Sequence, residues 1–136
     1  MIKLYIDIRE KNRNDKKERA PIQSLNLKLT GIIENIDCQG PFNGFCVVNL
    51  KVVKSSIKHY DPRDSLSYYY CLIKNEQAQI YQNAHEYEIG DSVFINSQIL
   101  SIKVKHKNGE EINSAILIYD NPFFYLHIKK FQSLFN

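Results

Sequence analysis

The sequence of 136 residues lacks the short motifs that mark common classes of enzyme. It has no Gly-x-Ser-x-Gly element, no glycine-rich phosphate loop and no carboxylate pair beside a candidate nucleophile. The histidines are isolated along the chain: His59, His85, His106 and His127. His59 lies near Asp61 and Asp64, but such a set in a proline-containing loop is more often solvated than bound to a metal. We therefore expect a non-enzymatic protein with no metal and no cofactor.

Cysteines and long apolar runs are also scarce. Cys38, Cys46 and Cys71 are odd in number and form no C-x-x-C pair, so the sequence predicts neither a disulfide framework nor a zinc knuckle. No segment approaches the roughly 20 apolar residues of a membrane span. We therefore expect no membrane association and a reducing, intracellular location, cytoplasmic in a bacterium and nuclear in a eukaryote.

The composition is that of an ordinary folded protein with little excess charge. Hydrophobic residues make up 43% and charged residues 24%, and the formal net charge is +3. The length fits one domain with a single modest core. This mild positive charge permits binding to nucleic acid but does not require it.

Apolar and aromatic residues predict mainly β-structure through the middle of the chain. The expected elements are a strand over 25–36 with a bend at Gly31, a strand over 45–53, a loop over 54–67, a strand over 68–73, a helix over 76–87, a long strand over 93–102, and a strand over 112–119. Asn108 and Gly109 tolerate the positive φ angles of a type I′ turn, so they should join the last two strands as a hairpin.

The two ends of the chain differ from this middle part. Residues 1–24 contain a short alternating segment and a basic arm, which ends at Pro21. In 121–136, large apolar residues recur at i, i+4, i+7 and i+11, a spacing typical of an amphipathic helix. These residues are Phe124, Ile128, Phe131 and Phe135. That stripe can cap the protein's own core or dock on another subunit.

A five-stranded barrel is the simplest arrangement of the predicted strands. Closing a short, twisted sheet removes its exposed edges. The expected fold is therefore all-β with minor α: a barrel over 25–120, a short helix between strands three and four, and a C-terminal helix.

This layout resembles the OB-fold, and within it the bacterial-type single-stranded DNA-binding protein family. The matching features are the strand that ends at Gly31, Ala78 in the predicted helix, the segment 88–95, and the turn 108–110. The resemblance implies binding of unstructured DNA through aromatic stacking and lysines, often as an oligomer. The chain departs from the family in having no Trp and no acidic C-terminal tip.

Tyrosines and basic residues near the predicted strands suggest how such a ligand is held. Aromatic rings stack on bases, and lysine and arginine neutralise phosphates. The candidate residues for binding single-stranded DNA or RNA are Lys51, Lys54, Lys58, Tyr60, Arg63, Tyr68, Tyr70, Lys74, Lys103, Lys105 and Lys107.

Each of these sets also has a structural interpretation. The tyrosines can pack the sheet with only their hydroxyl groups in water. The lysines after Ile102 can simply form a solvent face that guards a sheet edge against aggregation. The N-terminal arm can clamp phosphates or merely aid solubility. A second hypothesis for the function is a protein-interaction subunit, similar to small OB subunits of telomere-capping complexes, that binds a partner or itself through its C-terminal helix.

Overall fold

The computed structural model describes residues 22–38, 45–61 and 71–116. Apart from a short helical piece at 22–24, the elements in these ranges are β-strands. Their bounds are β1 (Lys28–Asp37), β2 (Phe45–Ser55), β3 (His59–Tyr60), β4 (Cys71–Lys74), β5 (Gln77–Asn83), β6 (Ser92–Asn96), β7 (Ser101–Lys105) and β8 (Glu111–Ala115). No helix in this described part has the length and apolar character that crossing a membrane requires.

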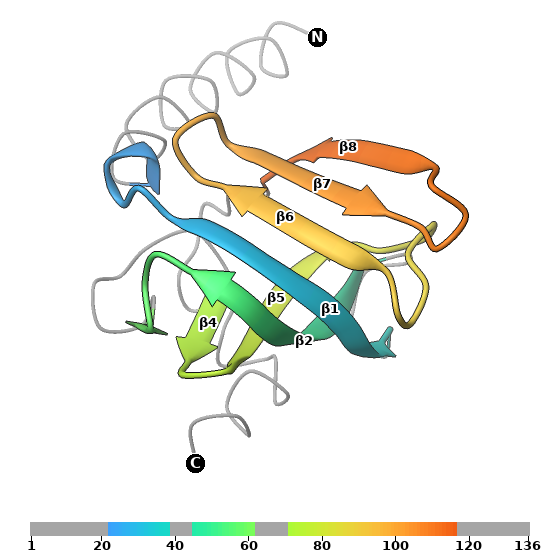
Figure 1. Ribbon diagram of the computed structural model, residues 1–136, viewed down its shortest axis with the longest axis horizontal. Coiled ribbons are helices and arrows are strands. Elements are labelled where there is room, and N and C mark those ends of the chain that lie inside the picture. The colour runs from blue at the N-terminus through green and yellow to red at the C-terminus, as the bar shows by residue number, and fades with distance from the viewer. Residues whose placement is uncertain (1–21, 39–44, 62–70, 117–136) are drawn as a thin grey trace, which may run out of the picture.

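The strands form one antiparallel sheet in the order β3-β4-β5-β2-β1-β6-β7-β8 (Figure 1). β1 lies at the centre and pairs with β2 along most of its length and with β6 near its start. It therefore joins two halves of the sheet, β4-β5-β2 on one side and β6-β7-β8 on the other.

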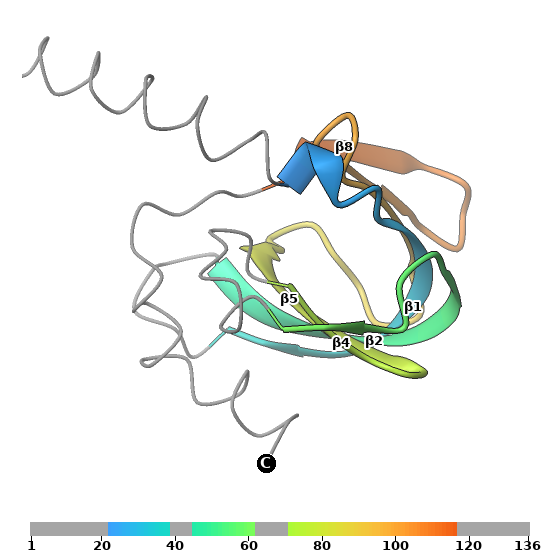
Figure 2. The same ribbon diagram turned by 90° about the vertical axis from the view of Figure 1, so that its left-hand side faces the viewer.

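Two irregularities in the pairing of β1 with β2 bend this sheet. The register shifts between Thr30 and Gly31 and again between Ile33 and Asn35. Such bulges bend a strand and increase its twist. A Cβ atom on Gly31 would lie 3.1 Å from the backbone oxygen of Lys51, so the close approach of β1 to β2 favours glycine there. The predicted bend at Gly31 is thus confirmed, and the sheet curls over its own concave side (Figure 2).

The hydrophobic core fills the concave side of the curled sheet. Alternate residues of β1, β6 and β7 point into it, as the burial pattern of each strand shows. Its members include Leu27, Leu29, Ile33, Val48, Leu50, Ile73, Ile80, Val93, Ile95, Ile102 and Val104. Gln82 Nε2 donates a hydrogen bond to the backbone oxygen of Ala115 at 3.0 Å, so a side chain of β5 reaches β8 across this side.

The predicted five-stranded barrel is wrong. The sheet has eight strands and is open, with β3 and β8 at its two ends. The link between β5 and β8 runs through the Gln82 side chain rather than through a ladder of backbone hydrogen bonds. The chain forms more and shorter strands than the hydrophobic pattern predicted, and they curl without closing.

The predicted helix over 76–87 is also wrong, because β5 occupies residues 77–83. This segment contains good helix formers, but pairing with β2 on one side and β4 on the other outweighs that weak preference. A turn that contains Asn75, at φ +56°, connects Lys74 directly back to Gln77. Since β5 is buried on both faces, its sequence lacks the alternation that marks a half-exposed strand.

The long strand predicted over 93–102 is two strands, β6 and β7, joined by a tight turn. Leu100 has a φ of +52°, and Ser97 exchanges two hydrogen bonds with Leu27. Ser97 Oγ accepts from the Leu27 N–H at 2.8 Å, and the Ser97 N–H donates to the Leu27 oxygen at 2.9 Å. These bonds fix the turn against the start of β1.

The hairpin predicted at Asn108 and Gly109 is confirmed, since β7 pairs with β8 antiparallel. Only Gly109 has a positive φ, +95°, so the turn is not of type I′. The Gly109 N–H donates to the His106 oxygen at 3.0 Å, which is the pattern of a type I turn followed by a glycine bulge. The two predicted strands over 25–36 and 45–53 are likewise observed as β1 and β2.

The cysteines differ from the prediction. Cys38 and Cys46 form a disulfide, with their Cα atoms 4.1 Å apart, whereas Cys71 is buried outside it. They lie one step beyond the Asp37–Val47 pair, so the disulfide extends the β1–β2 ladder. Sequence spacing alone cannot reveal a pair that the register of two strands brings together. The intracellular location stays a prediction.

Several predictions lie outside the described residues. They are the strand and basic arm within 1–21, the part of the predicted third strand over 68–70, and the C-terminal helix with Phe124, Ile128, Phe131 and Phe135. The same holds for Arg63, Tyr68 and Tyr70 of the predicted binding site.

Candidate nucleic-acid interface

The outer side of the sheet carries lysines that the strand register arranges in rows. One row crosses β2, β1, β6 and β7 and consists of Lys54, Thr30, Phe94 and Lys103. The neighbouring row consists of Lys51, Ile32, Ser92 and Lys105. Residues paired across antiparallel strands share a face, so both rows point outward, away from core residues such as Ile33 and Val104.

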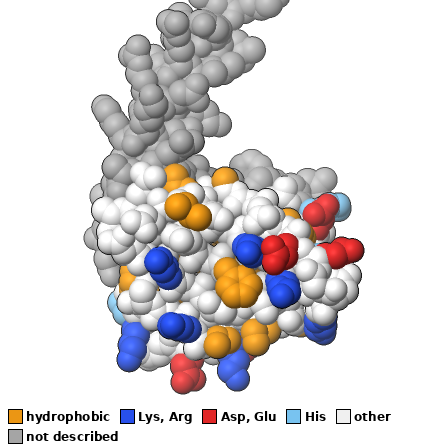
Figure 3. Space-filling view, turned by 45° about the horizontal axis from the view of Figure 1, so that its top comes forward, with side chains coloured by type: hydrophobic (Ala, Val, Ile, Leu, Met, Phe, Trp, Pro, Cys, Tyr) orange, Lys and Arg blue, Asp and Glu red, His pale blue; other side chains and the backbone are white. Residues whose placement is uncertain are grey.

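We call this surface the lysine face. It comprises Lys28, Ile32, Lys51, Val53, Lys54, Phe94, Lys103 and Lys105, from β1, β2, β6 and β7. Figure 3 shows basic side chains distributed around exposed hydrophobic groups on this side of the molecule. The exposed hydrophobic residues of this face are Ile32, Val53 and Phe94, and Phe94 is 39% exposed.

Charge on these strands is predominantly positive. β1, β2, β6 and β7 contain five lysines, and their acidic residues are Glu34 and Asp37, in the second half of β1. Lys103 forms an ion pair with Glu111 of β8 at 3.5 Å, and both side chains are 43% exposed. A pair this exposed contributes little to stability, so Lys103 can exchange Glu111 for another anion at small cost.

Backbone contacts hold the face in place near its first lysines. Ser56 Oγ accepts a hydrogen bond from the Lys28 N–H at 2.9 Å, and the Ser56 N–H donates to the Lys28 oxygen at 3.0 Å. Ser56 Oγ also donates to the Asn26 oxygen at 3.0 Å. Because Ser56 directly follows β2, these bonds fix the end of β2, where Lys54 lies, against the start of β1.

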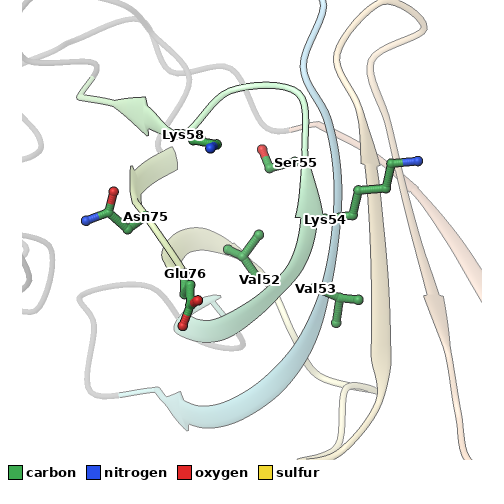
Figure 4. A pocket seen from close by; sticks show the side chains of 7 residues that line it. All are labelled: Val52, Val53, Lys54, Ser55, Lys58, Asn75 and Glu76. Carbon is green, nitrogen blue, oxygen red and sulfur yellow. The ribbon is translucent and has the colours of Figure 1, made fainter.

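A pocket of about 360 Å³ lies beside this face, between the end of β2 and the turn that connects β4 with β5. Its lining residues are Val52, Val53, Lys54, Ser55, Lys58, Asn75 and Glu76. In Figure 4 the side chains of Lys54 and Lys58 point in different directions. The lining thus mixes apolar groups with charges of both signs, which suits a small polar group such as the edge of a base.

The structure separates the predicted lysines into groups. Lys51, Lys54, Lys103 and Lys105 share the lysine face, and Lys58 joins Lys54 at the pocket. Lys74 is exposed on β4, where it extends the row of Lys51 through Gln77, and it lies four strands from Phe94 in the sheet order. Lys107 is exposed in the β7–β8 turn, where its side chain approaches Gly90. The sequence prediction therefore combined residues that do not belong to one surface.

The described tyrosines are poorly placed for stacking on a base. Tyr60 is half-buried and packs against the core cluster. Tyr81 and Tyr87 are buried, and this burial raises the pKa of both phenol groups above the usual value. Among the residues that the structure describes, Phe94 is instead the aromatic ring most available to a ligand.

Sequence reasoning missed Phe94, Ile32 and Lys28. A signal was available for Phe94, because Val93 and Ile95 flank it as alternating core residues and so place it on the opposite face. What was missing was the register that brings Phe94 beside Thr30 and Lys103, since cross-strand neighbours are set by pairing rather than by sequence distance.

Comparisons of the chain with protein-family models, with curated proteins and with solved structures find no match.

Proposed function

We propose that the protein binds single-stranded nucleic acid on the lysine face. The observation that carries this proposal is the position of Phe94, which is exposed in the middle of a row that has a lysine on either side. An exposed ring can stack on an unpaired base, which contributes about 1 to 3 kcal/mol per base, while nearby lysines neutralise phosphates.

The geometry of the rows supports an extended ligand. Neighbouring strands are about 4.8 Å apart, so Lys54 and Lys103 bracket Phe94 within a span of about 15 Å. The neighbouring row, with Lys51 and Lys105, doubles the number of lysines that the phosphate backbone of the ligand can contact. Since a double helix hides the faces of its bases, an exposed stacking ring favours a single strand over a duplex.

The first test is fluorescence anisotropy of a labelled oligo-dT strand titrated with the protein at several salt concentrations. If all five lysines of the face contact phosphates, the slope of log K against log salt should be about −3.5. The same strand in a duplex should bind more weakly. Absence of binding at low salt would contradict the proposal.

Matched substitutions locate the site. Phe94→Ala should weaken binding by about 5- to 160-fold, which corresponds to the loss of one stacked base at about 1 to 3 kcal/mol. Ile99→Ala removes an exposed apolar side chain from the β6–β7 turn and should leave affinity unchanged. Lys103→Gln should lower the salt slope by about 0.7, whereas Lys107→Gln, in the β7–β8 turn where its side chain lies over Gly90, should not. Equal losses in both lysine variants would mean that binding is not confined to this face.

A further inference from the structure

A buried carboxylate, that of Asp91, lies in the connection between β5 and β6. It directly precedes β6, so it is at the opposite end of this strand from the β6–β7 turn. The side chain of Asp91 is 1% exposed, and its Oδ2 accepts a hydrogen bond from the Glu88 N–H at 2.9 Å. The same Oδ2 lies 2.7 Å from Nδ1 of His106, whose side chain is 14% exposed. The other oxygen, Oδ1, is buried and has no hydrogen-bond partner among the described residues.

Glu88 completes this group. One ligand atom each from Glu88, Asp91 and His106 lies within 4.8 Å of the others, although the residues come from two connections that are distant in sequence. Burying a charged carboxylate with an unsatisfied oxygen is costly unless a cation or a further donor is bound. We propose that these three side chains form a binding site for a divalent transition-metal ion, with Zn²⁺ as the favoured ion.

The donor set argues for this class of ion. Imidazole and carboxylate together suit Zn²⁺ and related ions, whereas Mg²⁺ and Ca²⁺ prefer oxygen ligands alone. Zinc binds nitrogen and oxygen at about 2.0 to 2.2 Å, which places neighbouring ligands of a tetrahedral ion about 3.3 Å apart. The ion would replace the hydrogen bond between Asp91 and His106 with only a small movement of the two side chains, and water would occupy a fourth position.

The backbone around the site is already fixed. The Gly90 N–H donates to the Ile33 oxygen at 2.8 Å, and the Ile33 N–H donates to the Asp91 oxygen at 2.9 Å, so Asp91 is anchored to β1. The His106 N–H donates to the Glu110 oxygen at 2.8 Å and thereby sits in the base of the β7–β8 hairpin. An ion shared by these segments would tie the β5–β6 connection to the hairpin.

A nearby ammonium group offers a competing cation. A Cβ atom on Gly90 would lie 2.8 Å from Nζ of Lys107, so this side chain passes directly over the residue that precedes Asp91. Two outcomes are therefore distinguishable. If Lys107 balances the charge of the site, removing its ammonium should increase the affinity for a metal ion; if it plays no part, Lys107→Met should leave that affinity unchanged.

The experiment uses the full chain without an affinity tag and with its disulfide oxidised, so that Cys38 and Cys46 offer no thiolate. Isothermal titration with ZnCl₂ should give one site per chain, and MgCl₂ and CaCl₂ should give none. CoCl₂ should produce the absorption of a four- or five-coordinate ion with nitrogen and oxygen ligands. Bound Zn²⁺ should also raise the thermal unfolding temperature, because an ion that binds only the folded chain stabilises it.

Substitutions assign the ligands. His106→Ala should weaken Zn²⁺ binding by at least tenfold, and so should Glu88→Gln, whose exposed side chain can be changed without disturbing the core. His85→Ala and His59→Ala are matched controls, because both histidines are exposed and lie outside the cluster, and neither should alter binding. The proposal is overturned if folded protein takes up no Zn²⁺, or if binding persists in both His106→Ala and Glu88→Gln. These readouts need no nucleic acid, so they are independent of the proposed function.

Discussion

The outer sides of the two halves of the sheet differ, although both halves share one core on the concave side. In β4, β5 and β2, the outward residues Leu72, Tyr81 and Val47 are buried, and they do not belong to the core cluster. In β1, β6 and β7, the outward positions hold exposed Phe94 together with Lys28, Lys103 and Lys105. The first half is therefore covered on both sides around these three residues, whereas the second presents one side to solvent, and this exposed side continues onto Lys51, Val53 and Lys54 of β2.

This difference separates structural from functional roles. In a strand that is buried on both faces, the side chains of both faces are packed, so substitutions there should affect mainly stability. A strand with one free face can carry charged and aromatic groups at little cost to folding, and changes there should affect mainly binding. The contrast can be tested by measuring stability at matched positions.

The largest effect is expected for Leu72→Ala, in the half that is covered on both sides. Leu72 is 0% exposed, and truncating a buried leucine costs about 2 to 5 kcal/mol of unfolding free energy. Urea unfolding followed by circular dichroism measures this loss. Leu72→Met conserves volume and should cost less than about 1.5 kcal/mol. If the alanine variant loses less than the methionine variant, the outward side of β4 is not a packed surface.

A smaller effect is expected at the end of the β1–β2 ladder, where the two halves join. Replacing Cys38 by Ser together with Cys46 by Ala removes the disulfide, whose loop spans eight positions, and should lower the unfolding free energy by about 2 kcal/mol. Unfolding of the wild-type chain with and without reductant should give a similar difference. If a reductant lowers the unfolding free energy of the wild type but not that of the double variant, the effect belongs to this disulfide.

The smallest effect is expected for Phe94→Ala, on the lysine face. Phe94 is exposed, so its replacement by alanine removes only cross-strand contacts, and the unfolding free energy should fall by less than about 1 kcal/mol. The same urea titration provides the measurement. A loss as large as that of Leu72→Ala would show that Phe94 is a structural residue, and its exposed position would then say nothing about binding.

Some features of the fold were predictable from local chemistry. Gly31 marked a bend, because the close approach of the β2 backbone leaves little room for a side chain there. Asn108 with Gly109 marked a hairpin, because glycine readily adopts the positive φ that the turn requires. The alternation in β1 was also visible, since one of its faces is buried and the other is not.

Other features were hidden for physical reasons. The segment 77–83 is covered on both faces, so its sequence shows no alternation, and its helix-forming residues pointed to the wrong element. Asn96 and Ser97 are common turn residues at the break between β6 and β7, and Asn96 Oδ1 accepts a hydrogen bond from the Gln98 N–H at 3.1 Å. The apolar pair Ile99 and Leu100 nevertheless suggested that the strand continues, because leucine rarely adopts the positive φ that Leu100 has in this turn. The same holds for the lysine face: its lysines can be recognised in the sequence, but their cross-strand neighbours cannot, because pairing register sets them.

The sequence by itself determined that this chain forms β-strands with a mildly basic surface, because hydrophobic alternation and charge are local properties of neighbouring residues. Only the tertiary structure decided that the strands form an open, curled sheet, that Phe94 lies between Thr30 and Lys103, and that Cys38 meets Cys46. It also brought Asp91 to His106. Pairing register is set by the packing of the whole core, and a shift of one residue would turn every one of these side chains to another neighbour.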